Sequence, residues 1–411
     1  MSEATSPFAP RASKITYKPT IETFLALLED HFEGVIRFNV LTSAPQIFRH
    51  GKWQRWEDAD DSTVRLYFQS HYDLYHKNHL DDAMRVFLRQ HQVNPLTDLI
   101  DSLQWDGVPR IEEALHHITG CDDTPYTREV SRLLFAGGIH RAYRPGCKFD
   151  DVPVLIGAQG AGKSSAVRIL AMEDEFYRSL KTLEGDKGVE NILGSWIVEI
   201  EEMAAVTRAE GTGVVKAYIT NQEDLYRVKY DKHVQTIPRR CIFVGTGNEA
   251  LPADPTGNRR FYPVWVKRSG YEINGRKEEF TDYVRQCWAE AKALFDNKNL
   301  APYAKFELLG DIREEQALAT EDDPRQGMIA AYCSRKAIGE PVCVMELWEC
   351  ALHQNPAYKM PTPKDRRDIG SILNGLPGWE RAGNVRFSDY GVQKAFKKVY
   401  EHTERPPDCP F

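Results

Sequence analysis

The sequence predicts an α/β protein with a P-loop core, flanked along the chain by helical regions. The octapeptide 157–164, GAQGAGKS, matches the phosphate-binding pattern GxxxxGK[ST]. It lies between an apolar stretch, Val152–Ile156, and a helical stretch, Ser165–Met172, which is the context that the pattern requires. Two further apolar stretches, Trp196–Ile200 and Arg240–Gly245, each end in polar side chains, as buried strands of a parallel sheet do.

Composition limits the class of protein. The chain has 411 residues, 42% hydrophobic and 27% charged, as in a globular protein of two or three domains. A net charge of −7 excludes a wholly basic surface for nucleic acid, but not a basic loop or channel. No apolar run is long enough to cross a membrane, and the first 15 residues lack the apolar core of a signal peptide, so we expect a cytoplasmic protein without a membrane partner. The eight cysteines form no CxxC pair or zinc-ribbon spacing, which predicts reduced thiols and no structural metal.

Changes in periodicity divide the chain into five predicted parts. They are a disordered tail at 1–15, an N-terminal accessory domain at 16–93, a helical collar at 94–150, the P-loop ATPase core at 151–305 and a helical, winged-helix-like C-terminal region at 306–411. In the accessory domain we expect helices at Ile21–Phe32, Val64–Tyr75 and Asp81–Gln90, a β-like stretch at 46–56 and an acidic turn at Glu57–Asp61 that interrupts the domain.

Helical periodicity recurs on both sides of the core. The predicted helices are Ile111–Thr119 and Arg128–Ala142 before it, then Phe280–Phe295, Ile312–Ala319 and Asp368–Leu376 after it. Asp368–Leu376 is a candidate second helix of a winged helix, and Trp379–Phe387 is the candidate wing.

The P-loop predicts a site for ATP and Mg²⁺. Its glycines let backbone N–H groups fold around the β-phosphate at the positive end of the following helix. We expect Lys163 to reach the β- and γ-phosphates and Ser164 to offer its hydroxyl to Mg²⁺. The residues expected to contact the nucleotide are Gly157, Gly160, Ala161, Gly162, Lys163, Ser164 and Ser165.

Three acids follow on the second predicted strand. Glu201 and Glu202 come at its end, where one carboxylate would hold the water shell of Mg²⁺ and the next would polarise the attacking water. We expect Glu201 to serve the metal and Glu202 to be the base. Glu199 lies inside the strand, where it is either a third functional acid, a metal ligand, or a residue that faces a polar pocket. The alternative is an amphipathic strand with a solvated acidic end.

Polar residues also follow the third and fourth strands. Asn248 comes at the tip of the third, where a polar side chain can orient water against the γ-phosphate; the alternative is a turn-forming asparagine. Arg259 and Arg260 precede the aromatic strand that ends at Trp265. A guanidinium supplied across a subunit boundary would neutralise charge on the transferred phosphoryl group. The alternative is a structural arginine pair.

Taken in order, the segments LIGAQGAGKSS, GSWIVEIEEM, CIFVGTGN and GNRRFYPV resemble the virulence-associated protein E family. WDGVPRIEEAL and RPGCKFDDVPVL, which precede the P-loop, are similar to that family too, so that the resemblance covers roughly residues 95–330. It implies an AAA+ ATPase of the superfamily 3 helicase type, found in phages, plasmids and genomic islands, that forms a homo-oligomer, in general a hexameric ring.

The resemblance also implies a DNA-gripping hairpin between the second and third strands. The corresponding stretch, 216–240, holds six Lys or Arg and three acids, with aromatic side chains between them that can stack on bases. We expect Lys229, Lys232 and His233 at its tip to bind DNA. Arg227 and Arg239 are alternative candidates for contacting a neighbouring subunit's ATP, and a solvated hairpin without a DNA role is the remaining alternative.

Two flanking regions lie outside the family motifs. The hundred or so residues before the motor show no zinc site or set of catalytic carboxylates, so primase activity is not expected. Residues 357–399 hold nine Lys or Arg against four acids. Arg366, Arg367, Lys394, Lys397 and Lys398 suit phosphate contacts by a winged helix; a charged helical cap is the alternative.

The sequence therefore predicts an ATP-dependent DNA helicase or translocase in the replication of a mobile element. Its partners would be single-stranded or forked DNA, further copies of the chain, and a primase or origin-binding protein. One alternative is a nucleic-acid-responsive ATPase in defence or regulation. A second is a small-molecule P-loop phosphotransferase, which the order of Asn248 and the arginine pair disfavours.

Overall fold

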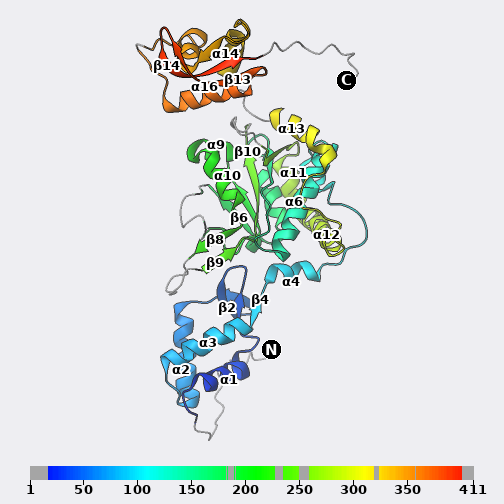
Figure 1. The fold of residues 1–411 in the computed structure, drawn as a ribbon. Helices are drawn as coiled ribbons and strands as arrows, with labels where there is room; N and C mark the ends of the chain where they lie inside the picture. The colour runs from blue at the N-terminus through cyan, green and yellow to red at the C-terminus, as the bar shows by residue number, and fades with distance from the viewer. Residues whose placement is uncertain are drawn as a thin grey trace. The chain divides into compact units, whose positions relative to one another are not determined.

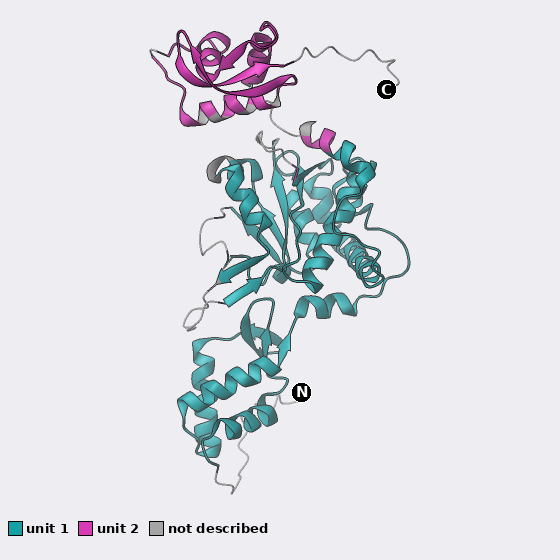
Figure 2. Ribbon diagram, in the orientation of Figure 1, with its two compact units in different colours: residues 1–249, 260–312 teal, residues 250–259, 313–411 magenta. Residues whose placement is uncertain are grey.

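A computed structural model describes residues 17–181, 183, 189, 191–226, 235–249, 259–318, 324–356 and 358–399. The chain divides into two compact units, residues 1–249 with 260–312 and residues 250–259 with 313–411 (Figure 2). The predicted tail at 1–15 lies outside the described residues.

Unit 1 is built around a five-stranded parallel sheet (Figure 1). The strands in chain order are β5 (Val152–Ile156), β6 (Tyr177–Leu180), β7 (Ile197–Ile200), β10 (Ile242–Gly247) and β11 (Phe261–Trp265), and they lie side by side in the order β11-β5-β10-β7-β6. Every neighbouring pair is parallel, and β5, β7 and β10 are buried along their whole length. The predicted α/β class is confirmed, whereas β6 was not predicted.

Helices cover both faces of this sheet. Figure 1 shows α9 (Met203–Glu210) and α10 (Thr212–Thr220) on one side, with α6 (Pro125–Tyr143) and α12 (Lys277–Asp296) on the other. Between β5 and β6 run α7 (Lys163–Leu170) and the 3-10 turn η1 (Asp174–Phe176). The predicted helices at Arg128–Ala142 and Phe280–Phe295 fall inside α6 and α12.

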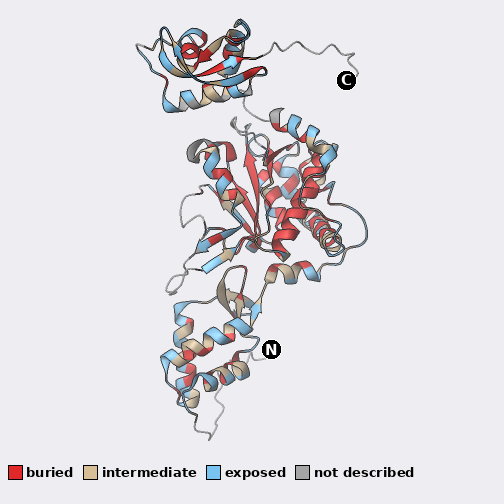
Figure 3. Cartoon of the chain, in the orientation of Figure 1, coloured by how far each residue is buried: buried red, intermediate tan, exposed pale blue. Residues whose placement is uncertain are grey.

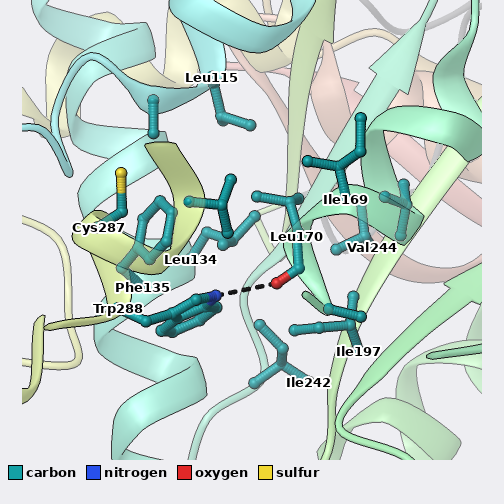
Figure 4. Packing of buried hydrophobic residues seen from close by; sticks show 14 of the residues in the cluster. Leu115, Leu134, Phe135, Ile169, Leu170, Ile197, Ile242, Val244, Cys287 and Trp288 are labelled. Carbon is teal, nitrogen blue, oxygen red and sulfur yellow. Dashed lines mark hydrogen bonds between the residues drawn. The ribbon is translucent and has the colours of Figure 1, made fainter. Parts of the chain in front are cut away.

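Helix α6 is the centre of the hydrophobic core (Figure 3). Nearly all of its residues are buried, and a Cβ at Gly138 would lie 2.4 Å from the Trp288 ring. Trp288 packs against Trp196, with 4.2 Å between ring centroids, and its indole N–H donates to the carbonyl of Leu170 at 2.9 Å (Figure 4). The predicted collar thus contributes its main helix to the same core as the sheet.

Residues 17–93 form a smaller α/β layer in unit 1. A four-stranded sheet, in the order β3-β2-β1-β4, packs with three helices around a separate apolar cluster. The elements are α1 (Ile21–Phe32), β1 (Ile36–Asn39), β2 (Ala44–Arg49), β3 (Lys52–Arg55), α2 (Asp58–Tyr72), α3 (Lys77–Gln90) and β4 (Gln92–Val93). The acidic turn predicted at Glu57–Asp61 is wrong: these residues begin α2, where acids are favoured at the positive helix end. Asp60 accepts a hydrogen bond from the Glu57 backbone N–H at 2.8 Å, which caps the helix.

Shorter elements complete unit 1. They are α4 (Pro95–Ser102), α5 (Ala114–Thr119), α11 (Gly270–Gly275), the 3-10 turn η2 (Phe306–Leu308) and an antiparallel hairpin of β8 (Glu223–Tyr226) and β9 (Gln235–Pro238). The hairpin lies within the stretch predicted to form one, whereas the beginning of that stretch belongs to α10. Its tip, residues 227–234, lies outside the described residues.

Unit 2 follows helix α13 (Leu309–Leu318), which spans the boundary between the units. Its elements are α14 (Pro324–Ser334), β12 (Pro341–Cys343), α15 (Val344–Glu346), the π-helical turn η3 (Leu347–Ala351), α16 (Pro363–Gly375), β13 (Trp379–Phe387) and β14 (Gly391–Lys398). The antiparallel sheet β12-β14-β13 packs with the helices around its own core. The candidate wing strand Trp379–Phe387 is present as β13, and the helix expected at Asp368–Leu376 begins five residues earlier, at Pro363.

Two absences concern the described residues alone. None of their helices is long and apolar enough to cross a membrane. Each of the seven described cysteines is a free thiol.

Candidate nucleotide-binding site

The glycine-rich loop, the three acids and Asn248 meet at the carboxyl edge of the central sheet, whereas Arg259 and Arg260 precede β11 and lie at its amino end. The glycine-rich loop 157–164 follows β5, the acids come from the end of β7, and Asn248 follows β10. Because β5, β10 and β7 are adjacent parallel strands, their carboxyl ends point to the same edge. Ligands of open α/β sheets bind at this edge.

The loop depends on glycine at close contacts. Gly160 and Gly162 have φ of +81° and +76°, in the left-handed region that glycine adopts without a steric penalty. The start of α11 lies directly against them: Gly270 donates its N–H to the Gly160 carbonyl at 3.0 Å. A Cβ at Gly270 would lie only 2.4 Å from that carbonyl oxygen. The segment after β11 therefore packs directly against the loop, a contact that was not predicted from the sequence.

Lys163 closes the loop with its ammonium group. Nζ donates to the carbonyls of Gly157 at 2.8 Å and Ala158 at 2.9 Å, and to Oδ1 of Asn248 at 2.8 Å. Burial lowers the pKa of Lys163, and the nearby carboxylates of Glu202 and Glu199 act in the opposite direction. The Lys163 ammonium group thus lies between the loop and the tip of β10. Its three hydrogen-bond acceptors are neutral oxygens.

Glu199 lies at the centre of a hydroxyl cluster. Its carboxylate is fully buried and accepts hydrogen bonds from Ser164 Oγ at 2.7 Å, Thr246 Oγ1 at 2.6 Å and the Tyr177 hydroxyl at 2.5 Å. Burial, then the Glu199 carboxylate, raises the pKa of Tyr177, so the phenol stays a donor. A buried carboxylate is costly unless hydrogen bonds or a cation compensate it. The sequence left several roles open for Glu199. In the structure its carboxylate lies beside the Ser164 hydroxyl of the loop.

Glu201 and Glu202 diverge. Glu201 accepts a hydrogen bond from Ser179 Oγ on β6, and its Oε2 lies 3.5 Å from Lys181 Nζ. Glu202 adopts the left-handed conformation, φ +46°, and its Oε1 accepts from Nδ2 of Asn248 at 3.1 Å. The structure therefore brings Glu202 to the loop through Asn248, whereas Glu201 contacts the neighbouring strand.

The two predicted arginines differ in their surroundings. Arg260 donates from Nε to Oδ2 of Asp150 at 2.8 Å and is half-buried, so this guanidinium is tied within its own chain. Arg259 is exposed. Arg239, the alternative candidate, is buried and forms a two-point ion pair with Asp224, which argues against a contact to a neighbouring subunit.

Four of the predicted site residues fall in a part of the chain that the structure does not describe. Lys229, Lys232, His233 and Arg227 lie outside the described residues. Tyr177 and Thr246 were missed by sequence reasoning; Thr246 lies beside Asn248 in the TGN tip of β10, which is a weak signal, and Tyr177 carries none.

A magnesium ion fits the donors present without a dedicated metal cage. No cluster of three or more His, Cys, Asp or Glu that could hold a metal occurs in the described part of the chain. Mg²⁺ at a nucleotide site keeps several waters and needs only one or two protein oxygens beside the phosphates. The Ser164 hydroxyl and the Glu199 carboxylate are suitable oxygens, and the cation would compensate the buried charge.

Comparison with known proteins decides the family. The model of the virulence-associated protein E-like domain matches residues 100–323, more than half of the chain and every residue of the site. The chain belongs to the virulence-associated protein E family. This virulence-associated protein E-like chain is also similar in fold to the apo structure of the NrS-1 C-terminal region, residues 305–718 of that protein, with a TM-score of 0.53 and 12% identity over 93% of this chain and 100% of that one. An A-form apo structure of the same region gives a TM-score of 0.50 at 12% identity and the same coverage. None of the curated proteins matches the chain in sequence.

Proposed function

We propose that this virulence-associated protein E-like chain is a magnesium-dependent ATPase of the AAA+, superfamily 3 type that moves along or unwinds DNA. Its setting would be the replication of a phage, plasmid or genomic island. One observation carries the ATPase: Lys163, Ser164 and Glu199 converge at the carboxyl edge of a parallel sheet. An ammonium group, a hydroxyl and a buried carboxylate beside a glycine-rich loop are complementary to a metal-bound triphosphate.

Each site residue has a role that its contacts support. Lys163 would exchange neutral carbonyl partners for phosphate oxygens, which bind an ammonium group more strongly because they are charged. Ser164 and Glu199 would hold Mg²⁺, which neutralises phosphate charge and orients the phosphates when bound. Glu202 would take a proton from the attacking water. Asn248 bonds to both Lys163 and Glu202, so it would set the distance between the base and the phosphates.

The arginine pair supports a composite site. Arg260 is held by Asp150, so its guanidinium is occupied within its own chain. Arg259, next to it and exposed, is the better candidate to reach the nucleotide of a neighbouring subunit. A site completed by a neighbour requires a homo-oligomer, and a hexameric ring is the form that the family resemblance implies.

DNA binding is assigned to the hairpin between α10 and β10. Its base is fixed by Arg239, which pairs with Asp224 and donates to the carbonyl of Tyr218 on α10. The chain from Glu202 to this hairpin is continuous through α9 and α10, because Glu202 is the N-cap of α9. Along the chain, two short helices and strand β8 therefore separate Glu202 from the segment that contains Lys229, Lys232 and His233.

The test is ATP hydrolysis with and without single-stranded DNA. Lys163→Ala should abolish turnover in both conditions, whereas Lys232→Ala should keep basal turnover and lose the stimulation by DNA. Lys277→Ala, at an exposed position on α12, is the matched control and should behave as wild type. If DNA does not change the rate of ATP hydrolysis and Lys163→Ala still abolishes hydrolysis, the ATPase assignment stands and the assignment as a DNA motor is rejected.

A second assay separates a helicase from a DNA-responsive ATPase. A forked duplex with one labelled strand is incubated with wild type and ATP. Strand release that requires ATP supports unwinding. DNA-stimulated hydrolysis without strand release instead supports a regulatory or defence ATPase.

A further inference from the structure

Unit 2 contains a groove between helix α16 and the β13–β14 hairpin. Its volume is about 690 Å³. Its lining residues are Val344, Arg366, Gly370, Asn374, Arg381, Gly383, Asn384, Lys394, Ala395 and Phe396. The groove lies in the part of the chain beyond the family match, which ends at residue 323, so the proposed motor function does not account for it.

The charges around α16 are segregated. Three cationic side chains line the groove, Arg366, Arg381 and Lys394, and all three are exposed. No Asp or Glu is among the lining residues that the structure describes. The two acids of α16, Asp365 and Asp368, instead bind Arg325 on α14, at 3.1 and 2.9 Å. The groove lining is therefore positive, and both acids of α16 are paired with Arg325. Glu380, next to Arg381 on β13, is exposed but does not line the groove.

The β13–β14 hairpin is irregular where it borders the groove. Asn384 on β13 lies opposite Lys394 on β14, and the register shifts between Arg381 and Gly383. Gly383 has φ +74°, as a glycine in a bulge commonly does. A bulge bends and twists the strand and redirects side chains. Arg381, at the start of the shift, donates from Nε to Asn374 Oδ1 on α16 at 3.1 Å. Arg381 thus joins the hairpin to the helix, with the rest of its guanidinium available to a ligand.

The groove corrects the residues expected from sequence. Lys398 is buried and donates to the Lys336 carbonyl at 3.2 Å, so it holds the fold of unit 2. Lys397 is exposed but does not line the groove. Arg366 and Lys394 line it as candidates for phosphate contacts, and Arg381 is added by the structure. The side chain of Arg367 lies outside the part that the structure describes.

The geometry points to double-stranded DNA, and we propose that unit 2 binds one sugar–phosphate backbone of a duplex in this groove. The major groove of DNA admits an α-helix or a two-stranded ribbon, so one of the two elements that border the cleft can enter it while the backbone beside that groove lies in the cleft. Arg366, Arg381 and Lys394 would contact phosphates, and Asn374 and Asn384 would add neutral hydrogen bonds. The apolar floor of Val344, Ala395 and Phe396 would face the sugars. This is a second DNA site, distinct from the predicted motor hairpin.

The test uses the full chain without nucleotide, titrated against a labelled 20-base-pair duplex at several salt concentrations. For Arg381→Ala with Lys394→Ala we expect the Kd for duplex to rise about tenfold or more. The slope of log K against log salt should fall by about 2, because each of the two cationic side chains would neutralise one phosphate. Arg366→Ala alone should reduce the slope by about 1. Arg335→Ala, also exposed in unit 2 but outside the groove, should match wild type.

Two results would overturn the proposal. One is an unchanged Kd and salt slope for duplex in folded variants, with folding checked by thermal melting. The other is an equal loss of affinity for single-stranded and duplex DNA together with loss of DNA-stimulated hydrolysis, which would make the groove part of the motor's track. Because basal and single-strand-stimulated ATP hydrolysis should be unaffected in the groove variants, failure here is distinguishable from failure of the proposed ATPase.

Discussion

Ser164 Oγ donates a hydrogen bond of 2.7 Å to Glu199 Oε1, and this bond joins the end of the glycine-rich loop to strand β7. The two residues are 35 positions apart, and the acid that meets the loop is the one inside β7, not the pair after it. A loop hydroxyl in direct contact with a buried carboxylate is a ready pair of oxygens for a hydrated divalent cation. The assignment of acids to roles follows from this contact.

Glu199→Gln should remove magnesium-dependent nucleotide binding. The substitution keeps the shape but removes the charge that would compensate a cation, and it presents an NH₂ group to hydroxyls that now donate to Glu199. We expect turnover to fall about 100-fold or more. ATP affinity should fall in Mg²⁺ but remain at the wild-type level in EDTA, measured with a fluorescent nucleotide. Glu201→Gln is the control; if it alone loses the magnesium dependence, Glu199 is a structural acid.

Glu202→Gln should separate binding from hydrolysis. Glu202 reaches the site through its hydrogen bond with Asn248, whereas the Ser164 hydroxyl donates to Glu199. Loss of a general base reduces turnover about 100- to 10,000-fold while Mg-ATP affinity stays near wild type. Single-turnover phosphate release measures the step directly. A variant with near-normal phosphate release would transfer the role of base to another group.

The sequence identified the loop, β5 and the approximate place of β7 and β10 because these are local patterns. It could not decide the role of Glu199, because an acid inside a strand is explained only by its neighbours. Those neighbours, Tyr177 and Thr246, come from β6 and β10, and the register of three strands brings them together. Strand β6 itself, YRSL, is four residues long and only its first and last residues are buried, so it lacks the continuous apolar pattern of a buried strand.

The arginine pair shows the same limit. Arg259 and Arg260 are identical residues in one turn, and nothing local distinguishes them. The partner that does so, Asp150, lies 110 positions earlier in the chain. Long-range pairing therefore carries information that local periodicity does not contain. The acidic stretch Glu57–Asp61 is a different case, because its capping bonds are local: it resembles a solvated turn when it is read without the helix that it caps.

Arg259→Ala and Arg260→Ala should fail in different ways. Arg260→Ala leaves Asp150 without its partner in a half-buried position, so the free energy of unfolding should fall by about 1–2 kcal/mol. Arg259→Ala should lower turnover without a change in thermal stability. If Arg259 acts across a subunit boundary, mixing Arg259→Ala with Lys163→Ala subunits should restore part of the activity, because some interfaces then carry both intact residues. Absence of any recovery in confirmed mixed oligomers would reject a composite site.

Asp151 gives a pH dependence of stability. Burial raises the pKa of this carboxyl from 3.8 to about 6, although the Tyr262 hydroxyl donates to it at 3.0 Å. Between these two pH values the folded chain holds a proton that the unfolded chain has released, so this group makes stability fall as pH rises toward 6 and levels off above it. Asp151→Asn cannot ionise. Its stability relative to wild type should therefore increase by about 1–2 kcal/mol between pH 5 and pH 8 in urea unfolding. A difference that is the same at both pH values would show that Asp151 titrates normally.

Gly270→Ala should weaken nucleotide binding from outside the loop. The added Cβ would lie 2.4 Å from the Gly160 carbonyl oxygen and 3.1 Å from the Gly162 nitrogen, so either the loop or the start of α11 must move. Backbone atoms cannot rotate away as a side chain can, and the N–H groups of the loop are the groups that would cradle the phosphates. We expect ATP affinity to fall about tenfold, with a loss of stability of about 1–3 kcal/mol from overpacking.

Gly275→Ala provides the matched control for that change. It lies at the other end of α11, where an added Cβ would meet no heavy atom within 4 Å beyond its neighbours and the backbone of its own helix. Alanine is also the better helix former, so this variant should be as stable as wild type or slightly more so and bind ATP normally. Isothermal titration of the two variants with ATP, beside their melting curves, separates a local effect on the loop from a general effect on the helix. Equal affinities for Gly270→Ala and Gly275→Ala would mean that α11 does not set the shape of the loop, and that the contact between Gly270 and Gly160 is dispensable for binding.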